Sequence, residues 1–593
     1  MTARPDRSGP VDAPPFATKL AGLLVRLRRG GDEALLRATV ALLCEERDLG
    51  NVCVLLTAHV GRTLPGHAPF PAAQDWRHGL LATGLCGDGE HDEPTPLVLR
   101  PDDRLYLLRH WRTERSLEAA LRTRLEAADL VPATTIRGAL QPLGLAAQPG
   151  RSEPDWQLAA ITLAAQRPFA LLCGGPGTGK TTTVARLLAL LLRVAPATRI
   201  ALAAPTGKAA ARLGEALLAR PETATFPAGA VRKPTTLHSL LGYRPLDDSF
   251  VRGPDRPLSY DVVVVDEVSM IDPALLAALL AALRPNARLL LVGDKDQLAA
   301  VAAGQVLGEL TRDVVPGRVG ARLAAFVRDA TGMELPVSAD APPIADAAVA
   351  LVTNHRFGAD SGIGAFAAAL AARRPEAALA ALGSGRADLE TTNDPAAALA
   401  TIADELVAAA RARDPAEALR LLSSVRVLCA SRHGTLGTAA WNERIEALLR
   451  ERGLRVEGPL YRGRPILVLA NDHQNHVWNG DLAVLHPDAD GRTMAWLPGA
   501  DGAPRAIAPA RLPPHETAWA MTVHKSQGSE FDTVLVSMPD RPGPSWQAPL
   551  VYTAITRARR RAVLVADPAL LPAALATWPT RTSGLAAGLA RPR

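Results

Sequence analysis

The most informative stretch of the sequence reads Gly174-Gly175-Pro176-Gly177-Thr178-Gly179-Lys180-Thr181. It fits the pattern G-x-x-x-x-G-K-[ST], follows the apolar run Phe169 to Cys173, and precedes a helical pattern that starts at Thr182. Such glycines let backbone N–H groups turn toward the β- and γ-phosphates of ATP at a helix N-terminus. Lys180 is expected to reach between those phosphates, and the Thr181 hydroxyl to ligate Mg²⁺. A Gly-rich turn that binds nothing is the alternative, which the flanking strand and helix patterns disfavour.

Short apolar runs alternate with helical patterns after this loop. They lie at Ile200 to Ala204, Val262 to Val265 and Leu289 to Val292, and again late in the chain at Val425 to Cys429, Val534 to Ser537 and Ala562 to Ala566. Continuous β-type runs separated by helices are typical of a parallel sheet covered on both faces. The sequence therefore predicts an α/β fold with two such sheets.

Other segments have a different texture. Residues 20–145 read as mostly helical, with no motif that indicates chemistry, so docking or scaffolding is the expected role. Residues 148–153 resemble a linker, and residues 312–346 read as irregular. From about Leu448 to Pro514 the chain is rich in Gly, Pro and Asn with short strand-like runs, which indicates a small β insertion.

Polar side chains follow two of the predicted strands. Asp266 and Glu267 come directly after Val265, at the strand end where ligands of open α/β sheets bind. Asp266 can take part in the coordination shell of a Mg²⁺ ion, and Glu267 can polarise the water that attacks the phosphate. Gln297 follows the next strand and is a candidate sensor of the γ-phosphate. Solvated loop residues are the alternative for the acids, and a polar turn for Gln297.

Composition restricts the class of protein. The 593 residues include 66 Lys+Arg against 60 Asp+Glu, a net charge of +6, which permits a nucleic-acid partner without requiring one. The 5 cysteines are widely spaced and form no CxxC pair, which argues against a disulfide framework or a zinc ribbon and favours the cytoplasm. No export signal or membrane-spanning stretch is evident, so no membrane partner is expected.

In their order and spacing, these motifs resemble those of superfamily-one helicases, and most closely the RecD branch, the alpha subunits of exodeoxyribonuclease V. The resemblance runs from about Asp155 to Val565. It implies that Gln157 reads the adenine edge and that Arg356 and Arg557 are arginine fingers, because phosphoryl transfer needs cations at the developing charge. His355 departs from the family pattern, which has a tyrosine beside the first arginine.

The same resemblance implies contacts to single-stranded DNA. The residues it assigns to that role are Thr206, Lys208, Thr236, His238, Thr522, His524 and Lys525. A helix cap is the alternative for Thr206. Backbone contacts of this kind are independent of base sequence and sensitive to salt.

The resemblance also implies the architecture and the partners. We expect a helical N-terminal docking domain at residues 1–148 and two RecA-like P-loop helicase domains, at 149–355 and 356–593. The second would carry an SH3-like insertion at about 448–514. The implied activity is ATP-dependent translocation on single-stranded DNA and five-prime to three-prime unwinding. RecB-like and RecC-like subunits would complete a heterotrimer that processes double-strand breaks for recombinational repair.

The lysines argue against a nuclease site in this chain. One common nuclease motif needs an acid two positions before a lysine, and none of the six lysines has one. The residues at those positions are Ala17, Thr178, Thr206, Val231, Gly293 and Val523. A stand-alone helicase would share every motif, although the tandem hairpins of longer free-standing relatives are not evident in residues 1–145. A P-loop kinase or a binding ATPase would explain the phosphate loop alone, and a non-catalytic scaffold explains least.

Overall fold

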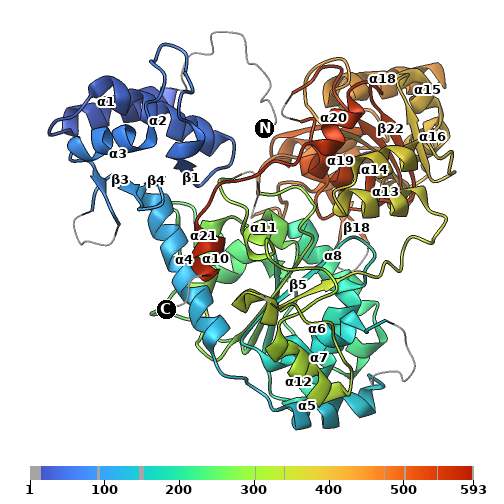
Figure 1. Cartoon of the computed structure of the whole chain (residues 1–593). Coiled ribbons are helices and arrows are strands. Elements are labelled where there is room, and N and C mark those ends of the chain that lie inside the picture. Colours follow the sequence, from blue (N-terminus) through green and yellow to red (C-terminus); the bar gives the residue numbers. More distant parts are fainter. Residues whose placement is uncertain are drawn as a thin grey trace.

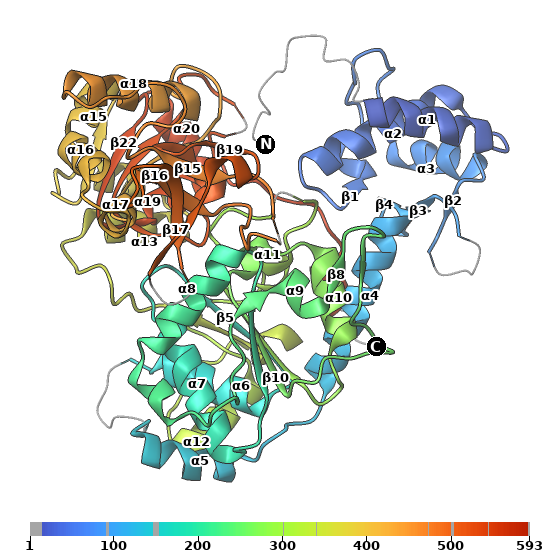
Figure 2. The same cartoon turned by 180° about the vertical axis from the view of Figure 1, so that it is seen from behind.

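The structure is a computed structural model that describes residues 15–89, 94–145, 153–300, 302–339, 341–472, 474–499, 503–543 and 545–590. The predicted domain boundary at 148–149 and nearly all of the predicted linker lie outside these residues. Figures 1 and 2 show the N-terminal part and the second α/β unit on opposite sides of one end of the first α/β unit.

The first α/β unit is built on a six-stranded sheet with the order β12-β5-β11-β10-β6-β7, in which every pairing is parallel. Its strands are β5 (Phe169–Gly174), β6 (Ile200–Ala204), β7 (Thr235–Thr236), β10 (Val262–Val265), β11 (Arg288–Gly293) and β12 (Ala348–Leu351). The four predicted strands are confirmed. The two edge strands, β7 with its two residues and β12, were not predicted from the sequence.

Both faces of this sheet are buried, as predicted. Leu172 and Val264 pack with α5 (Ala133–Leu140), α6 (Trp156–Gln166) and α7 (Lys180–Val194). Their neighbours Leu171 and Val263 pack on the other face with α4 (Leu108–Glu126), α9 (Leu237–Leu241) and α10 (Pro273–Ala282). Successive side chains of a strand point to opposite faces, so a strand covered on both sides is apolar throughout.

The second α/β unit is built on a five-stranded sheet with the order β13-β22-β21-β14-β20, again parallel throughout. Its strands are β13 (Leu389–Thr392), β14 (Val425–Cys429), β20 (Ala520–Thr522), β21 (Phe531–Ser537) and β22 (Ala558–Val565). Helices α13 (Gly362–Ala371), α14 (Pro375–Leu382) and α19 (Ala548–Ile555) cover one face. Helices α16 (Ala403–Arg411), α17 (Pro415–Leu422) and α18 (Thr438–Glu451) cover the other.

An antiparallel sheet interrupts this unit between β14 and β20. Its order is β18-β17-β16-β15-β19. The strands are β15 (Pro465–Val468), β16 (Leu482–Pro487), β17 (Thr493–Pro498), β18 (Pro504–Ile507) and β19 (His515–Thr517). The insertion is therefore β-structured, whereas residues 448–451 belong to α18. Its SH3-like character stays a prediction.

The N-terminal part combines helices with a small sheet. Helices α1 (Pro15–Leu27), α2 (Glu33–Asp48) and α3 (Ala73–Ala82) accompany the strand order β1-β4-β3-β2. The strands are β1 (Cys53–Leu55), β2 (Cys86–Gly87), β3 (Leu97–Leu99) and β4 (Arg104–Leu107). The mostly helical prediction missed this sheet, because strands of two to four residues are too short to establish an alternating pattern.

Two further features differ from expectation or were not expected. Residues 312–346 were predicted to be irregular, but α12 (Ala321–Thr331) lies within them and packs on the core of the first unit. The chain leaves the second unit after α20 (Leu571–Ala576) and returns to the first, where α21 (Leu585–Ala590) packs against α4 (Figure 1). Across the described residues, no helix is both long and apolar enough to cross a membrane.

Candidate functional site

The glycine-rich loop joins β5 to α7 and is shaped by two glycines in the left-handed region, Gly177 at φ 78° and Gly179 at φ 87°. A Cβ atom at Gly177 would lie 2.4 Å from Cβ of Arg356, and one at Gly179 would lie 2.3 Å from Nε2 of Gln157. Both positions therefore require glycine. Helix α7 begins at Lys180, two residues before the predicted start at Thr182.

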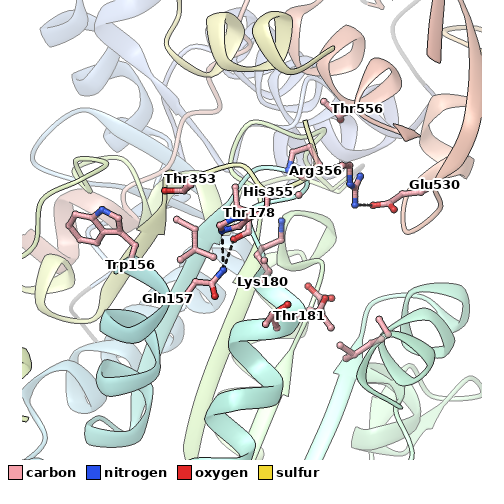
Figure 3. Close-up of a pocket in the computed structure, with 18 of the residues that line it drawn as sticks. Trp156, Gln157, Thr178, Lys180, Thr181, Thr353, His355, Arg356, Glu530 and Thr556 are labelled. Atoms are coloured by element: carbon pink, nitrogen blue, oxygen red, sulfur yellow. Dashed lines mark hydrogen bonds and ion pairs between the residues drawn. The ribbon is translucent and has the colours of Figure 1, made fainter. Parts of the chain in front are cut away.

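Lys180 points into the loop rather than into solvent. Its Nζ atom donates to the carbonyl oxygens of Gly174 at 2.7 Å and Gly175 at 3.0 Å. Figure 3 shows Lys180 beside Thr178 and Thr181 at the start of the helix. The ammonium is thus placed where a phosphate group bound by the loop would meet it.

A cavity of about 760 Å³ opens beside this loop and is lined from both α/β units. All six predicted catalytic residues line it: Lys180, Asp266, Glu267, Gln297, Arg356 and Arg557. Gln157 and residues 176–182 line it as well, whereas Gly174 and Gly175 do not. A volume of this size suits a ligand the size of a nucleotide.

The two acids lie at the C-terminal end of β10. Glu267 has φ 53°, a left-handed conformation that few non-glycine residues adopt, and its backbone N–H donates to Oδ1 of Asp266 at 2.8 Å. The pKa of Asp266 is raised to about 6, chiefly by burial and also by the Glu267 carboxylate, while Lys180 opposes the shift. The site thus holds a carboxyl group whose ionisation a nearby cation would favour.

The fit of a Mg²⁺ ion depends on how many ligands the protein supplies. Within the described parts of the chain, no group of three or more His, Cys, Asp or Glu side chains could hold a metal alone. Thr181 and Asp266 line the same cavity and offer two oxygen ligands. Mg²⁺ usually takes few protein ligands and completes its shell with phosphate oxygens and water, so these two residues fit the ion as a companion of ATP.

Gln297 and Arg557 meet across the boundary between the two units. Nη2 of Arg557, which follows α19, donates to Oε1 of Gln297 at 2.5 Å, and both residues are at most 6% exposed. The first unit's polar loop and the second unit's arginine are therefore already in contact at the cavity.

Arg356 pairs with a residue that the sequence analysis missed. Its Nη2 atom lies 2.8 Å from Oε1 of Glu530, and Figure 3 shows the two side chains pointing toward each other. Arg212 of α8 (Gly207–Leu218) also binds Oε1 of Glu530, and Arg559 lies 3.2 Å from Oε2. Burial alone would raise the pKa of Glu530, but Arg212 and Arg356 hold it far below its usual value. The only sequence signal was the position of Glu530, two residues after Gly528.

Gln157 lies at the rim of the loop. Its Nε2 atom donates to the carbonyl oxygen of Thr178 at 3.2 Å, and its Oε1 atom accepts from Arg186 at 3.3 Å. Nε2 of His355 lies 3.4 Å from the same amide nitrogen, so the histidine that departs from the family pattern is next to Gln157 (Figure 3). This side of the cavity is thus polar and faces the loop.

Two regions of this chain match known protein families. Residues 157–303 match the AAA domain, and residues 517–565 match the UvrD-like helicase C-terminal domain. A RecBCD enzyme subunit RecD of Mycobacterium tuberculosis is 40% identical over 586 residues, which cover 95% of this chain and 93% of the relative. The chain belongs to the RecD family.

Two further relatives share about a third of their residues with this chain. RecBCD enzyme subunit RecD of Haemophilus influenzae is 32% identical over 602 residues, covering 92% of each chain. An ATP-dependent RecD2 DNA helicase of Deinococcus radiodurans is 31% identical over 514 residues, which cover 85% of this chain and 60% of the relative. This RecD-family chain thus spans most of the length of the RecD subunits and a smaller share of the RecD2 helicase.

Two threonines assigned to DNA contact in this RecD-family chain are helix caps. Oγ1 of Thr206 accepts from the N–H of Ala209 at 3.2 Å, and Oγ1 of Thr236 accepts from the N–H of Ser239 at 3.1 Å. The helix-cap alternative for Thr206 is therefore observed. A capping hydroxyl still has its own hydrogen to donate, so a phosphate contact remains compatible with the cap.

The remaining residues assigned to DNA contact differ in their surroundings. His238 is exposed, with its ring 5.2 Å from that of Tyr243, and His524 is also exposed. Nζ of Lys525 lies 2.6 Å from Oε1 of Glu516, so this cation is engaged within the protein. Burial lowers the pKa of Lys208 to about 8. Thr522 ends β20 at the carboxyl edge of the second sheet.

Proposed function

We propose that this chain is an ATP-dependent translocase on single-stranded DNA and a five-prime to three-prime DNA helicase. We further propose that it is the motor subunit of an exodeoxyribonuclease V type complex with RecB-like and RecC-like subunits. Its role would be to process double-strand breaks for recombinational repair, with any nuclease site on a partner. The observation that carries the proposal is the cavity lined by predicted catalytic residues of both α/β units, with Arg557 contacting Gln297.

The arrangement supports hydrolysis by positioning and charge. Lys180 and the N–H groups of the loop would bind the β- and γ-phosphates, and Glu267 would accept a proton from the attacking water. Arg356 and Arg557 would stabilise the charge that develops on the transferred phosphoryl group. A Mg²⁺ ion held by Thr181 and Asp266 would neutralise part of the phosphate charge.

Movement on DNA would follow from the position of the cavity between the two units. ATP that contacts residues of both units favours their closure, and hydrolysis removes that link. Thr206, Thr236 and Thr522, three of the residues assigned to DNA, lie at or just after the carboxyl ends of strands in the two sheets. Alternating grip at these edges would move the chain along the backbone. The polarity rests on the family resemblance.

Other functions are less well supported. A P-loop kinase does not need a second α/β unit whose arginine contacts the first unit. The hydrogen bond between Arg557 and Gln297 therefore favours a motor. A stand-alone helicase is the nearer alternative, because the RecD2 helicase is 31% identical to this chain.

A cytoplasmic location is part of the proposal and is supported by the described cysteines, which are all free and buried.

A direct test is unwinding of duplexes with a five-prime or a three-prime overhang, by the chain alone and co-purified with the RecB-like and RecC-like subunits of the same organism. We expect unwinding from the five-prime overhang that Lys180→Gln abolishes. ATP hydrolysis that is unaffected by single-stranded DNA would overturn the motor function. Full activity of the chain alone would favour the stand-alone alternative.

A further inference from the structure

Asp294 lies behind the cavity and accepts hydrogen bonds from both α/β units. Its Oδ2 atom accepts from Nε2 of Gln297 at 3.2 Å and from the hydroxyl of Tyr552, on α19, at 3.0 Å. Its Oδ1 atom accepts from the backbone N–H of Asp296 at 3.1 Å. Asp294 and Tyr552 are each 2% exposed, so these bonds are shielded from water.

The amide of Gln297 is consequently held in one orientation. A guanidinium can only donate and an ionised carboxylate can only accept. Arg557 therefore requires the amide oxygen on its side, and Asp294 requires the amide nitrogen on the other. A flipped amide would lose both bonds, in a site from which water is largely excluded.

Tyr552 ties this arrangement to the phosphate loop and to the second unit. A Cβ atom at Gly175 would lie 3.1 Å from the Tyr552 hydroxyl, so the phenol lies directly against the loop that positions Lys180. The next residue, Thr553, accepts from the backbone N–H of Leu298 at 2.9 Å through Oγ1. Tyr552 and Thr553, which are consecutive residues of α19, therefore form hydrogen bonds with the two ends of the segment 294–298.

We propose that Tyr552 is a positioning residue for ATP hydrolysis, whose hydroxyl orients Gln297 through Asp294 and couples that orientation to the second unit. This inference rests on the proposed function. Tyr552 would not touch the reacting atoms. Its hydroxyl binds the carboxylate of Asp294, which in turn binds the amide of Gln297, so a movement of α19 would be transmitted to Gln297.

Tyr552→Phe tests this role because it removes only the hydroxyl. We expect kcat for DNA-stimulated ATP hydrolysis to fall about tenfold, as for a lost hydrogen bond to a charged group, with KM for ATP within about twofold. Tyr461→Phe is the matched control. Tyr461 is also a buried tyrosine of the second unit, and its hydroxyl donates to Glu446 and accepts from Trp519, each at 2.8 Å. The control should retain the wild-type kcat.

A double-variant cycle separates positioning from general damage. If Tyr552 acts through Gln297, then Tyr552→Phe in a Gln297→Ala background should lower kcat by less than about twofold. Rates of ATP hydrolysis are measured on the full chain purified with its partner subunits. The rate that remains in the Lys180→Gln complex is subtracted, and the difference is assigned to this chain. Thermal unfolding of each variant verifies that it is folded.

The outcomes distinguish this inference from the function on which it rests. A wild-type complex whose hydrolysis is unchanged by Lys180→Gln contradicts the proposed function. A wild-type complex that passes that test, together with Tyr552→Phe at the wild-type rate, contradicts the positioning role alone. An independent tenfold loss in the Gln297→Ala background does the same.

Discussion

Nη2 of Arg356 lies 2.8 Å from Oε1 of Glu530, while Nη1 of the same guanidinium is buried without a hydrogen-bond partner among the described residues. Arg356 is close to the phosphate loop, since a Cβ at Gly177 would meet its Cβ at 2.4 Å. In this structure the arginine is thus held by a carboxylate of the second unit.

The charge on Glu530 should be visible in the pH dependence of stability. The folded-state pKa of Glu530 is far below the ordinary value of 4.5. The stability that its ionised carboxylate contributes to the folded state is therefore present above about pH 4.5 and is lost as the pH falls below that value. Glu530→Gln should lower the free energy of unfolding at pH 7 by about 1–3 kcal/mol, because it removes charge-assisted bonds to arginines. Urea unfolding at pH 7 and pH 4 should show a smaller acid loss in the variant than in the wild type. Equal acid losses would contradict the assignment.

Lys180 should be needed for hydrolysis and dispensable for folding. Among the described residues its ammonium donates only to two loop carbonyls, so its loss should cost the fold little. Lys180→Gln should therefore abolish ATP hydrolysis while changing the free energy of unfolding by less than about 1 kcal/mol. Lys19→Gln is the control, because Lys19 is exposed on α1 outside every motif. Hydrolysis assays and urea unfolding on the three proteins check both parts. Retained hydrolysis in Lys180→Gln would refute the role of Lys180.

Mg²⁺-dependent nucleotide binding should weaken in mild acid. The pKa of Asp266 is raised to about 6, and a metal ion binds the ionised form, so binding releases a proton and competes with protonation below that pH. Titration with fluorescent ADP at pH 5.5 and 7.5, with and without Mg²⁺, should show that the enhancement by Mg²⁺ is larger at pH 7.5. Asp266→Asn should remove this difference, and a variant that keeps it would exclude Asp266 as the ligand.

The C-terminal segment should depend on Glu114 of α4. Both carboxylate oxygens accept from the N–H of Gly584 at 3.1 Å, and they also accept from Ser583 and Tyr106. Glu114→Gln places an amide N–H₂ against these donors and should cost about 1–3 kcal/mol in the free energy of unfolding. Glu33→Gln, which loses only surface ion pairs with Arg28 and Arg37, should cost less than about 1 kcal/mol. Hydrogen exchange of residues 582–590 should rise only in Glu114→Gln.

The local patterns of the sequence predicted the central strands of both parallel sheets, but not β7, β12, β13 and β20. The phosphate loop is predictable because its glycines, lysine and threonine act over eight consecutive residues. Asp266 and Gln297 are predictable because the carboxyl ends of neighbouring parallel strands meet at one edge of a sheet. The short strands of the N-terminal sheet were missed, since two to four residues carry too little periodicity.

The sequence alone therefore determined the parallel-sheet class, the phosphate loop, the two acids and the family resemblance, all of which follow from short-range patterns. Only the tertiary structure brought Arg356 to Glu530, Tyr552 to Asp294, and the C-terminal segment to Glu114. Each of these pairs joins residues more than 170 positions apart. Such a pairing depends on how segments distant in the sequence pack together, and its energy depends on the low-dielectric surroundings that this packing creates.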